Sequence, residues 1–290
     1  MMREPLFTGT CTAMVTPFLN GQVNYPMMEM LLRRQMDAGI SAVVLCGTTG
    51  ESATLTDEEK IELFRRCKEY VGDEMLIIAG TGSNSTAHAA QLSLDAQNAG
   101  ADALLVVSPY YNKATPEGLI AHYLTIAHSV RIPLIIYNVP SRTGVDIPVS
   151  VYERLARIPN IAGVKEASTD IQKILSIRTR CPNDFTVWSG NDDMTVPIIS
   201  LGGQGVISVG SNIMPEEFQA MTSAAMDGDF DTAAALQSSL SKLSELLFCE
   251  VNPIPVKAAM ELIGYDCGGC RLPLTSLSAE NQKKLQTFFQ

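Results

Sequence analysis

Residues 75–107 read MLIIAGTGSNSTAHAAQLSLDAQNAGADALLVV, and this stretch contains the unit from which the fold is built. Two short apolar runs, Met75–Ala79 and Ala103–Val107, flank a segment of helical period, Ser83–Ala99. The runs lack polar alternation, which is typical of strands covered on both faces. A strand, a helix and a second strand in this order indicate a parallel βαβ unit.

The same unit recurs along the chain at intervals of roughly 20 to 33 residues. Helical period between the runs is clearest in Tyr25–Ala38 and in Asp57–Tyr70, which opens with the capping box Thr56-x-x-Glu59. Eight strand–helix units predict a closed (β/α)8 barrel of the α/β class. The predicted strands are Thr10–Val15, Ala42–Cys46, Met75–Ala79, Ala103–Val107, Leu134–Tyr137, Ile161–Val164, Thr186–Trp188 and Gly205–Val209.

Helical segments with no strand between them follow Gly210. They are Pro215–Met226, Asp231–Phe248, Pro255–Ile263 and Ser278–Phe289. The first would complete the barrel, and the others predict a C-terminal helical extension. No linker rich in Pro, Gly or Ser separates the two parts. We therefore expect a barrel over residues 1–226 with an extension over residues 227–290, rather than two independent domains.

Composition restricts the possible classes of function. Apolar residues make up 46% of the 290 residues and charged residues 18%, so a large core can be buried. The net charge of -10 argues against nucleic acid as a partner. Met1 to Phe7 lacks the features of a signal peptide, and no stretch approaches the roughly 20 apolar residues that span a membrane. We expect a cytoplasmic protein with no membrane partner.

Cysteine and histidine patterns give no sign of a metal site. The seven cysteines, an odd number scattered along a long chain, are interpreted as reduced thiols. Cys267-Gly-Gly-Cys270 has CxxC spacing, but no second pair and no nearby histidine completes a zinc set, so a glycine-rich loop is favoured. His88, His122 and His128 lack H-E-x-x-H spacing. We expect neither a metal nor a cofactor.

Polar residues gather where the predicted strands end, the rim at which parallel barrels carry their chemistry. Each group alone could be ordinary turn chemistry, but five groups at one rim indicate a site. They are Gly47-Thr48-Thr49-Gly50-Glu51, Pro109-Tyr110-Tyr111-Asn112, Tyr137–Gly144, Val164-Lys165-Glu166 and Ser189-Gly190-Asn191-Asp192.

Lys165 is the candidate nucleophile. It follows the apolar strand Ile161–Val164, and desolvation lowers the pKa of an ammonium, which frees a neutral amine to attack a carbonyl. Alternatively, Lys165 extends out of the barrel end or pairs with Glu166. Other lysines fall on helical segments, where a solvated face explains them: Lys60, Lys68, Lys173, Lys242, Lys283 and Lys284.

Neighbouring side chains fit carbonyl chemistry at Lys165. The strand that ends at Tyr137 is adjacent in the barrel, so a tyrosine hydroxyl could relay protons, although Tyr137 could also simply cap the barrel top. Thr48 and Thr49 offer a carboxylate or phosphate cradle that lacks the lysine and the spacing of a nucleotide-binding loop. Arg142 could bind a second carboxylate through two hydrogen bonds.

Long motifs of this chain resemble those of the pyruvate-dependent class I lyases, the family that includes the dihydrodipicolinate synthases. They are GTTGESAT at residues 47–54, YNVPSRTG at 137–144 and NPIPVK at 252–257. The similarity covers nearly the whole chain, in order. It implies a lyase that holds pyruvate as a Schiff base on Lys165 and condenses it with L-aspartate 4-semialdehyde in lysine and diaminopimelate biosynthesis.

The resemblance also implies roles for individual residues. Tyr137, Thr48 and Tyr111 would form a proton relay, with Tyr111 supplied by the neighbouring subunit across a dimer interface. Thr49 would bind the carboxylate of pyruvate, and Arg142 the carboxylate of the semialdehyde.

Further positions match the pocket and assembly of this family. The backbones of Gly190 and Ile207 match positions that line the pocket, and Asn191 stands where many members carry Asp. Members are usually homotetramers built as dimers of dimers.

A regulatory site is implied at the same dimer interface, where lysine-inhibited members bind lysine. His88 stands where inhibited members carry a glutamate, and Lys60 where they carry a histidine. The missing acid and the added cation predict weak or absent inhibition by lysine. The other matching positions are Ser52, Ala53, Asn84 and Tyr110.

Two other functions remain as alternatives. N-acetylneuraminate lyases and keto-deoxy sugar-acid aldolases use the same lysine and tyrosine, but they tend to carry Ser-Thr in the first loop and generally lack the arginine. Thr48, Thr49 and Arg142 therefore favour the synthase. A barrel that only binds a keto acid or a partner protein would be expected to lose Lys165, Tyr137 or Thr48, and all three are present.

Overall fold

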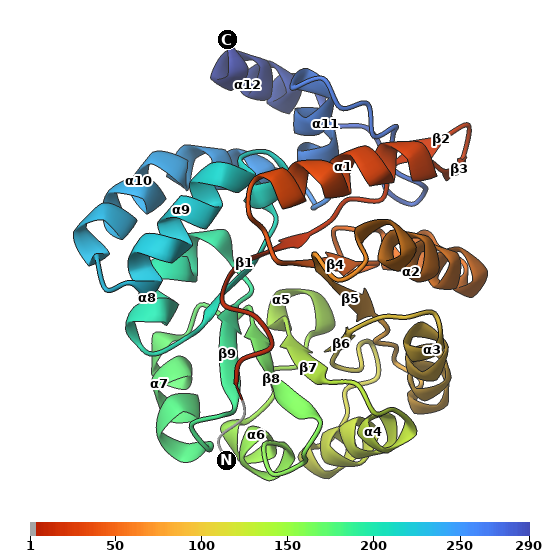
Figure 1. Ribbon diagram of the computed structural model, residues 1–290, viewed down its shortest axis with the longest axis vertical. Coiled ribbons are helices and arrows are strands. Elements are labelled where there is room, and N and C mark those ends of the chain that lie inside the picture. Colours follow the sequence, from red (N-terminus) through yellow and green to blue (C-terminus); the bar gives the residue numbers. More distant parts are fainter. Residues whose placement is uncertain (1–3) are drawn as a thin grey trace.

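Eight parallel strands close into a barrel in the computed structural model, which describes residues 4–290 (Figure 1). Around the barrel they follow the order β1-β10-β9-β8-β7-β6-β5-β4. The predicted (β/α)8 barrel is confirmed, and the strands are β1 Gly9–Ala13, β4 Ala42–Leu45, β5 Leu76–Gly80, β6 Ala103–Val107, β7 Leu134–Asn138, β8 Ile161–Glu166, β9 Thr186–Ser189 and β10 Gly205–Ser208.

The strands are mostly apolar because both of their faces are buried. Along β4, Val43 and Leu45 belong to the large cluster between the strands and the helices, whereas Ala42 and Val44 belong to a separate cluster inside the barrel. Alternate residues of a strand point to opposite faces, so a strand buried on both sides needs apolar residues at every position.

Helices surround the barrel (Figure 1). They are α1 Tyr25–Asp37, α2 Asp57–Val71, α3 Thr86–Asn98, α4 Pro116–Ser129, α5 Pro140–Thr143, α6 Val149–Leu155, α7 Ile171–Arg180, α8 Thr195–Ser200 and α9 Pro215–Met226. Short 3-10 turns and a small hairpin complete this part: η1 Ser52–Thr54, η2 Asp192–Met194, η3 Gly210–Asn212, β2 Phe18–Leu19 and β3 Gln22–Val23.

Helix starts follow from local capping. The predicted capping box is confirmed, because the Thr56 hydroxyl accepts from the Glu59 N–H while the Glu59 carboxylate accepts from the Thr56 N–H. Helix α3 begins three residues later than expected, since the Ser85 hydroxyl accepts from the His88 N–H and makes Ser85 the N-cap. Ser83 is therefore left in the loop at the barrel rim.

The predicted C-terminal helical extension consists of α10 Phe230–Leu247, α11 Ile254–Leu262 and α12 Ala279–Phe289. Helix α10 packs against α9 and α8, and α11 and α12 lie at the α1 end of the view (Figure 1). The boundary after residue 226 stays a prediction.

Residues 1–3, which belong to the start where we expect no signal peptide, lie outside the described residues. Within residues 4–290, no helix has the length and apolar character needed to cross a membrane.

Candidate active site

Lys165 lies near the C-terminal end of β8 with its side chain directed to the barrel interior. The side chain is 5% exposed, and its Nζ lies 4.5 Å from the centroid of the Tyr137 ring. Tyr137 on β7 is the direct register partner of Lys165, so the predicted adjacency of the two strands is confirmed. The nucleophilic amine and the phenol therefore share one face of two paired strands.

A cavity of about 330 Å³ opens at Lys165. Its wall brings together most of the predicted site residues, which lie at the C-terminal ends of β4, β7, β8 and β9 or in the segments that follow them. These are Thr48, Thr49, Tyr137, Arg142, Lys165 and Gly190. Thr49 is buried, and its hydroxyl oxygen accepts a hydrogen bond from Asn252 Nδ2 at 3.0 Å.

Two predicted residues do not line this cavity. Ile207 is fully buried in the barrel interior, and Val209, two residues closer to the rim, contributes to the wall instead. Tyr111 is 86% exposed and has a φ of +74°, a left-handed conformation that is uncommon outside glycine. It is thus exposed to solvent in the single chain and is absent from the cavity wall at Lys165.

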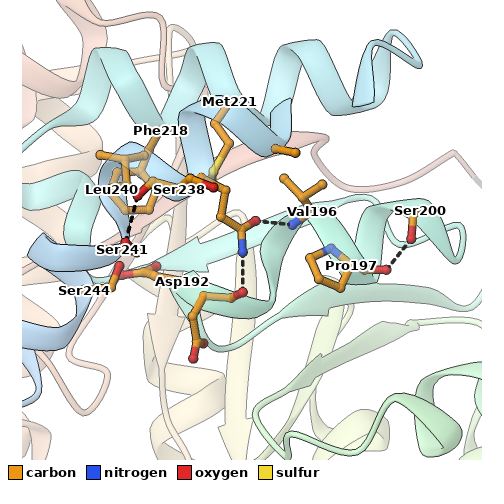
Figure 2. Close-up of a pocket in the computed structure, with 13 residues that line it drawn as sticks. Asp192, Val196, Pro197, Ser200, Phe218, Met221, Ser238, Leu240, Ser241 and Ser244 are labelled. Carbon is orange, nitrogen blue, oxygen red and sulfur yellow. Dashed lines mark hydrogen bonds between the residues drawn. The ribbon is translucent and has the colours of Figure 1, made fainter. Parts of the chain in front are cut away.

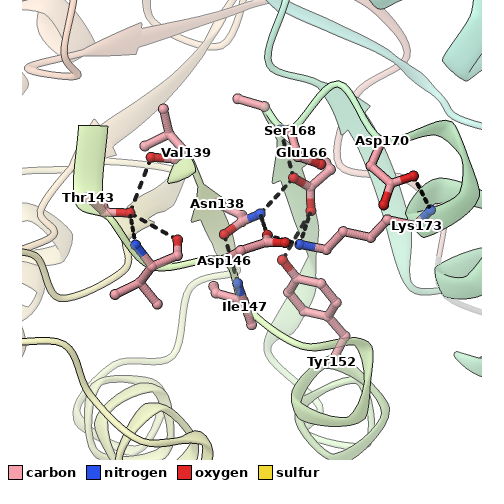
Figure 3. Close-up of polar contacts among 12 residues, drawn as sticks. Asn138, Val139, Thr143, Asp146, Ile147, Tyr152, Glu166, Ser168, Asp170 and Lys173 are labelled. Atoms are coloured by element: carbon pink, nitrogen blue, oxygen red, sulfur yellow. Dashed lines mark hydrogen bonds and ion pairs between the residues drawn. The ribbon is translucent and has the colours of Figure 1, made fainter. Parts of the chain in front are cut away.

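Glu166, the residue after Lys165, makes polar contacts with residues of the surrounding helices α6 and α7 (Figure 3). Glu166 is fully buried, and its carboxylate accepts hydrogen bonds from Asn138 Nδ2 at 2.7 Å and from the Tyr152 hydroxyl at 3.1 Å. Lys173 Nζ lies 3.4 Å from the same carboxylate. These contacts hold Glu166 outside the barrel, so the alternative of a Lys165–Glu166 pair is wrong.

This outer network also supports the loop that carries Arg142. Asn138 Nδ2 donates to Asp146 at 2.8 Å, and Asn138 Oδ1 accepts from the Ile147 N–H at 3.1 Å. Lys173 forms an ion pair with Asp146. The placement of Lys173 on a solvated helix face is therefore wrong: it is buried because two carboxylates compensate its charge.

A second cavity, of about 740 Å³, adjoins the first and shares Thr48, Tyr137 and Arg142 with it. It contains all the residues that match the implied regulatory site. They are Ser52, Ala53, Lys60, Asn84, His88 and Tyr110.

Charges in this second cavity are paired through Asp57. Lys60 Nζ lies 3.1 Å from Asp57 Oδ1, and His88 Nε2 lies 2.7 Å from Asp57 Oδ2. Burial opposes ionisation of Asp57, but the hydrogen bonds from His88 and Lys60 outweigh it, and the pKa of Asp57 is lowered. Lys60 is itself buried, so its expected place on a solvated face is also wrong.

The C-terminal extension contacts the loop that carries Thr48 and Thr49. Lys257 Nζ donates to Glu51 Oε1 at 2.8 Å, to the Thr16 carbonyl at 2.9 Å and to the Gly269 carbonyl at 2.9 Å. Glu51 Oε2 accepts from the Arg271 N–H at 2.9 Å. Sequence reasoning missed this anchor, although a lysine inside the mostly apolar helix Ile254–Leu262 was a usable signal.

The Cys267-Gly-Gly-Cys270 segment belongs to this anchor, since Gly269 supplies one of the carbonyls bound by Lys257. Burial raises the pKa of Cys267 to about 12 and that of Cys270 to about 11. Both thiols are therefore protonated near neutral pH, a poor state for a metal ligand or a redox nucleophile.

A further cavity, of about 420 Å³, lies between α8, α9 and α10 (Figure 2). Gln237 bridges its wall by accepting from the Val196 N–H at 2.8 Å and by donating to the Asp193 carbonyl. Asp192 also lines it, and burial raises the pKa of this carboxyl, which accepts from the Gly210 N–H at 2.7 Å. The bond joins the loops after β9 and β10, a structural role.

Comparison with known proteins identifies the family. The chain matches the Dihydrodipicolinate synthetase family over residues 6–290. A 4-hydroxy-tetrahydrodipicolinate synthase of Acetivibrio thermocellus is 47% identical over 97% of this chain and 95% of the relative. A protein of the same name from Methanosarcina mazei is 46% identical over 97% of this chain and 96% of the relative.

Solved structures agree with this assignment. Dihydrodipicolinate synthase from Aquifex aeolicus superimposes with a TM-score of 0.96 at 43% identity, covering 97% of both chains. The Acinetobacter baumannii enzyme, solved in complex with pyruvate, has a TM-score of 0.95 at 40% identity and covers 97% of both chains. A lysine-bound structure from Cyanidioschyzon merolae has a TM-score of 0.95 at 40% identity, with 98% of this chain and 97% of the other covered. The chain therefore belongs to the dihydrodipicolinate synthetase family.

Proposed function

We propose that the protein condenses pyruvate with L-aspartate 4-semialdehyde through an imine on Lys165. This is the activity of a 4-hydroxy-tetrahydrodipicolinate synthase, a Schiff-base-forming lyase of lysine and diaminopimelate biosynthesis. The observation that carries the proposal is the buried Lys165 amine, which lies against the Tyr137 ring in a cavity that also contains Thr48, Thr49 and Arg142. The names of relatives at 46–47% identity support it.

In the first half of the reaction, the Lys165 amine attacks the C2 carbonyl carbon of pyruvate. The oxygen leaves as one water molecule, and a protonated imine remains. The Tyr137 ring lies against the amine, and in this proposal its hydroxyl delivers a proton to the departing oxygen and is reprotonated through Thr48. Thr49 holds the pyruvate carboxylate during these steps.

In the second half, loss of a proton from C3 of the imine gives an enamine. The enamine carbon attacks the aldehyde carbon of the semialdehyde and forms the new carbon–carbon bond. The amino group of the same substrate then attacks the imine carbon, closes the ring and expels the Lys165 amine. The water released at the imine step is the only one lost, and no cofactor is required.

A paired assay tests the proposed substrates. Pyruvate is supplied with L-aspartate 4-semialdehyde in one assay and with N-acetylmannosamine in the other. We expect turnover in the assay with the semialdehyde and none in the assay with N-acetylmannosamine. The opposite result would assign the chain to the sugar-acid lyases.

Arg142 lines the cavity wall and is expected to bind the carboxylate of the semialdehyde. Arg142→Ala should lower kcat/KM for the semialdehyde by about 10- to 100-fold, because a charged hydrogen bond contributes about 1.5–3 kcal/mol. Trapping of the pyruvate imine by borohydride should remain, since Arg142 acts on the second substrate. Ordinary kinetics with the semialdehyde would contradict this role and favour a sugar-acid aldolase.

The proposed assembly is a homotetramer, a dimer of dimers in which Tyr111 enters the site of its neighbour. The exposure of Tyr111 and its absence from the wall of its own cavity support this proposal. All seven cysteines are free thiols, which fits a reducing compartment, and the proposed location is the cytoplasm.

We expect weak or absent inhibition by L-lysine. Asp57, an acid that could receive a lysine amino group, is already paired with Lys60 and His88. A second ammonium about 4 Å from Lys60 would be repelled by about 1 kcal/mol in water and about 4 kcal/mol at a protein surface. Titration of lysine into the coupled assay measures the effect.

The matched variant for this prediction restores the side chains of inhibited members. Lys60→His combined with His88→Glu should increase sensitivity to lysine, because it removes one cation and adds one acid. Strong inhibition of the unaltered protein at sub-millimolar lysine would contradict the prediction.

A further inference from the structure

Asn252 connects the C-terminal extension to the proposed pyruvate site. It lies between α10 and α11, is 4% exposed, and lines the cavity at Lys165. Its Nδ2 lies 3.0 Å from Thr49 Oγ1, although the two residues are 203 positions apart in the sequence. The contact joins two buried side chains in the cavity wall.

The orientation of the Asn252 amide, with Nδ2 toward Thr49 Oγ1, sets the direction of this hydrogen bond. An amide nitrogen has two protons and no lone pair that accepts a hydrogen bond. Asn252 therefore donates and Thr49 Oγ1 accepts, which leaves the hydroxyl proton of Thr49 free. A carboxylate only accepts hydrogen bonds, so it can accept this proton from the Thr49 hydroxyl.

We propose that Asn252 is a positioning residue that holds the Thr49 hydroxyl as a hydrogen-bond donor toward the pyruvate carboxylate. This inference rests on the proposed function, in which Thr49 binds that carboxylate. Asn252 Oδ1 is buried and has no hydrogen-bond partner among the described residues. The bond to Thr49 is accordingly the one that holds the amide in place.

The backbone of the loop is held independently of Asn252. Glu51, two residues after Thr49, is bound by Lys257 Nζ at 2.8 Å and by the Arg271 N–H at 2.9 Å. Both side chains of the Glu51–Lys257 ion pair are buried. Replacing Asn252 should therefore change the direction of one hydroxyl and leave the loop itself in place.

A double-mutant cycle on the full-length protein tests the proposal. Thr49→Val removes the hydroxyl with little change in shape. Asn252→Asp replaces the donor with an acceptor that takes the Thr49 proton. Any repulsion between the new carboxylate and pyruvate is present in both backgrounds and cancels in the cycle. The KM for pyruvate at saturating semialdehyde is measured for all four proteins, together with the pyruvate concentration that half-saturates borohydride trapping.

We expect Asn252→Asp to raise the KM for pyruvate by about 10- to 100-fold more in the unaltered background than in Thr49→Val. The KM for the semialdehyde should change little. Asn252→Ala adds no charge. It should also raise the KM for pyruvate more in the unaltered background than in Thr49→Val, but by a smaller factor. Melting temperatures of all variants identify any change caused by loss of folding.

The possible outcomes separate the two proposals. Equal effects of Asn252→Asp in both backgrounds would overturn the positioning role, because the amide would then be reversed or merely structural. If Thr49→Val alone leaves pyruvate binding unchanged, the assignment of Thr49 fails, and the role of Asn252 fails with it. Both roles are supported if Asn252→Asp raises the KM for pyruvate more strongly when Thr49 is present and leaves the KM for the semialdehyde unchanged.

Discussion

Borohydride added with pyruvate is expected to inactivate the enzyme and to attach the reduced substrate to Lys165. Borohydride reduces a protonated imine to a stable secondary amine, so the modified residue is the one that formed the imine. Within the described part of the chain, Lys165 is a buried lysine whose Nζ contacts a tyrosine ring and forms no hydrogen bond or ion pair. No acid within the described residues therefore holds this amine in an ion pair.

Three other buried lysines serve as internal controls, because each is bound to a carboxylate: Lys60, Lys173 and Lys257. Peptide mass spectrometry locates the label. Lys165→Ala should abolish labelling and reduce turnover by at least about 10³-fold, as expected when a covalent nucleophile is lost. A label on Lys257, or no label at all, would show that the assignment of Lys165 is wrong.

Tyr111→Phe is expected to remove most of the activity although the residue lies outside the cavity of its own chain. Loss of a proton-transferring hydroxyl costs about 10²- to 10⁴-fold. If Tyr111 serves the neighbouring site, co-expression of Tyr111→Phe with Lys165→Ala subunits should restore activity. In a hybrid dimer one site has both groups and the other has neither, so random pairing should recover about a quarter of full activity.

The matched control pairs Tyr137→Phe with Lys165→Ala. Tyr137 and Lys165 are register partners in one barrel, so no hybrid dimer contains an intact site and no activity should return. A monomeric variant with a folded barrel should be inactive for the same reason as Tyr111→Phe. If the Tyr111→Phe mixture fails to recover activity while the dimers form, Tyr111 acts within its own chain.

Much of the barrel and part of the site could be predicted from the order of residues along the chain. Eight apolar runs with helical segments between them predict parallel strands, and parallel strands place their C-terminal ends at one rim. Lys165 and Tyr137 follow two consecutive runs, so their proximity was predictable and is confirmed by the register of β7 and β8. These features depend on local periodicity and on the strand order of a closed barrel.

The burial of charged residues could not be predicted in this way. Lys60 and Lys173 occupy helical positions that suit a solvated face, yet both are buried against carboxylates. Burying the charge of a lysine ammonium is costly, and an acid within ion-pairing distance offsets that cost. For Lys173, the partners Asp146 and Glu166 precede it on other elements, and helical period carries no information about them.

The sequence by itself therefore determined the barrel, the rim that carries the site, and Lys165 with Tyr137 at adjacent strand ends. Tertiary structure alone decided that Asn252 binds Thr49, that Lys257 binds Glu51, and that Tyr111 lies outside its own cavity. The physical reason is the range of the interactions. Strands and helices follow from the periodic burial of neighbouring residues, whereas a hydrogen bond across 203 positions exists only after the extension has packed against the barrel rim.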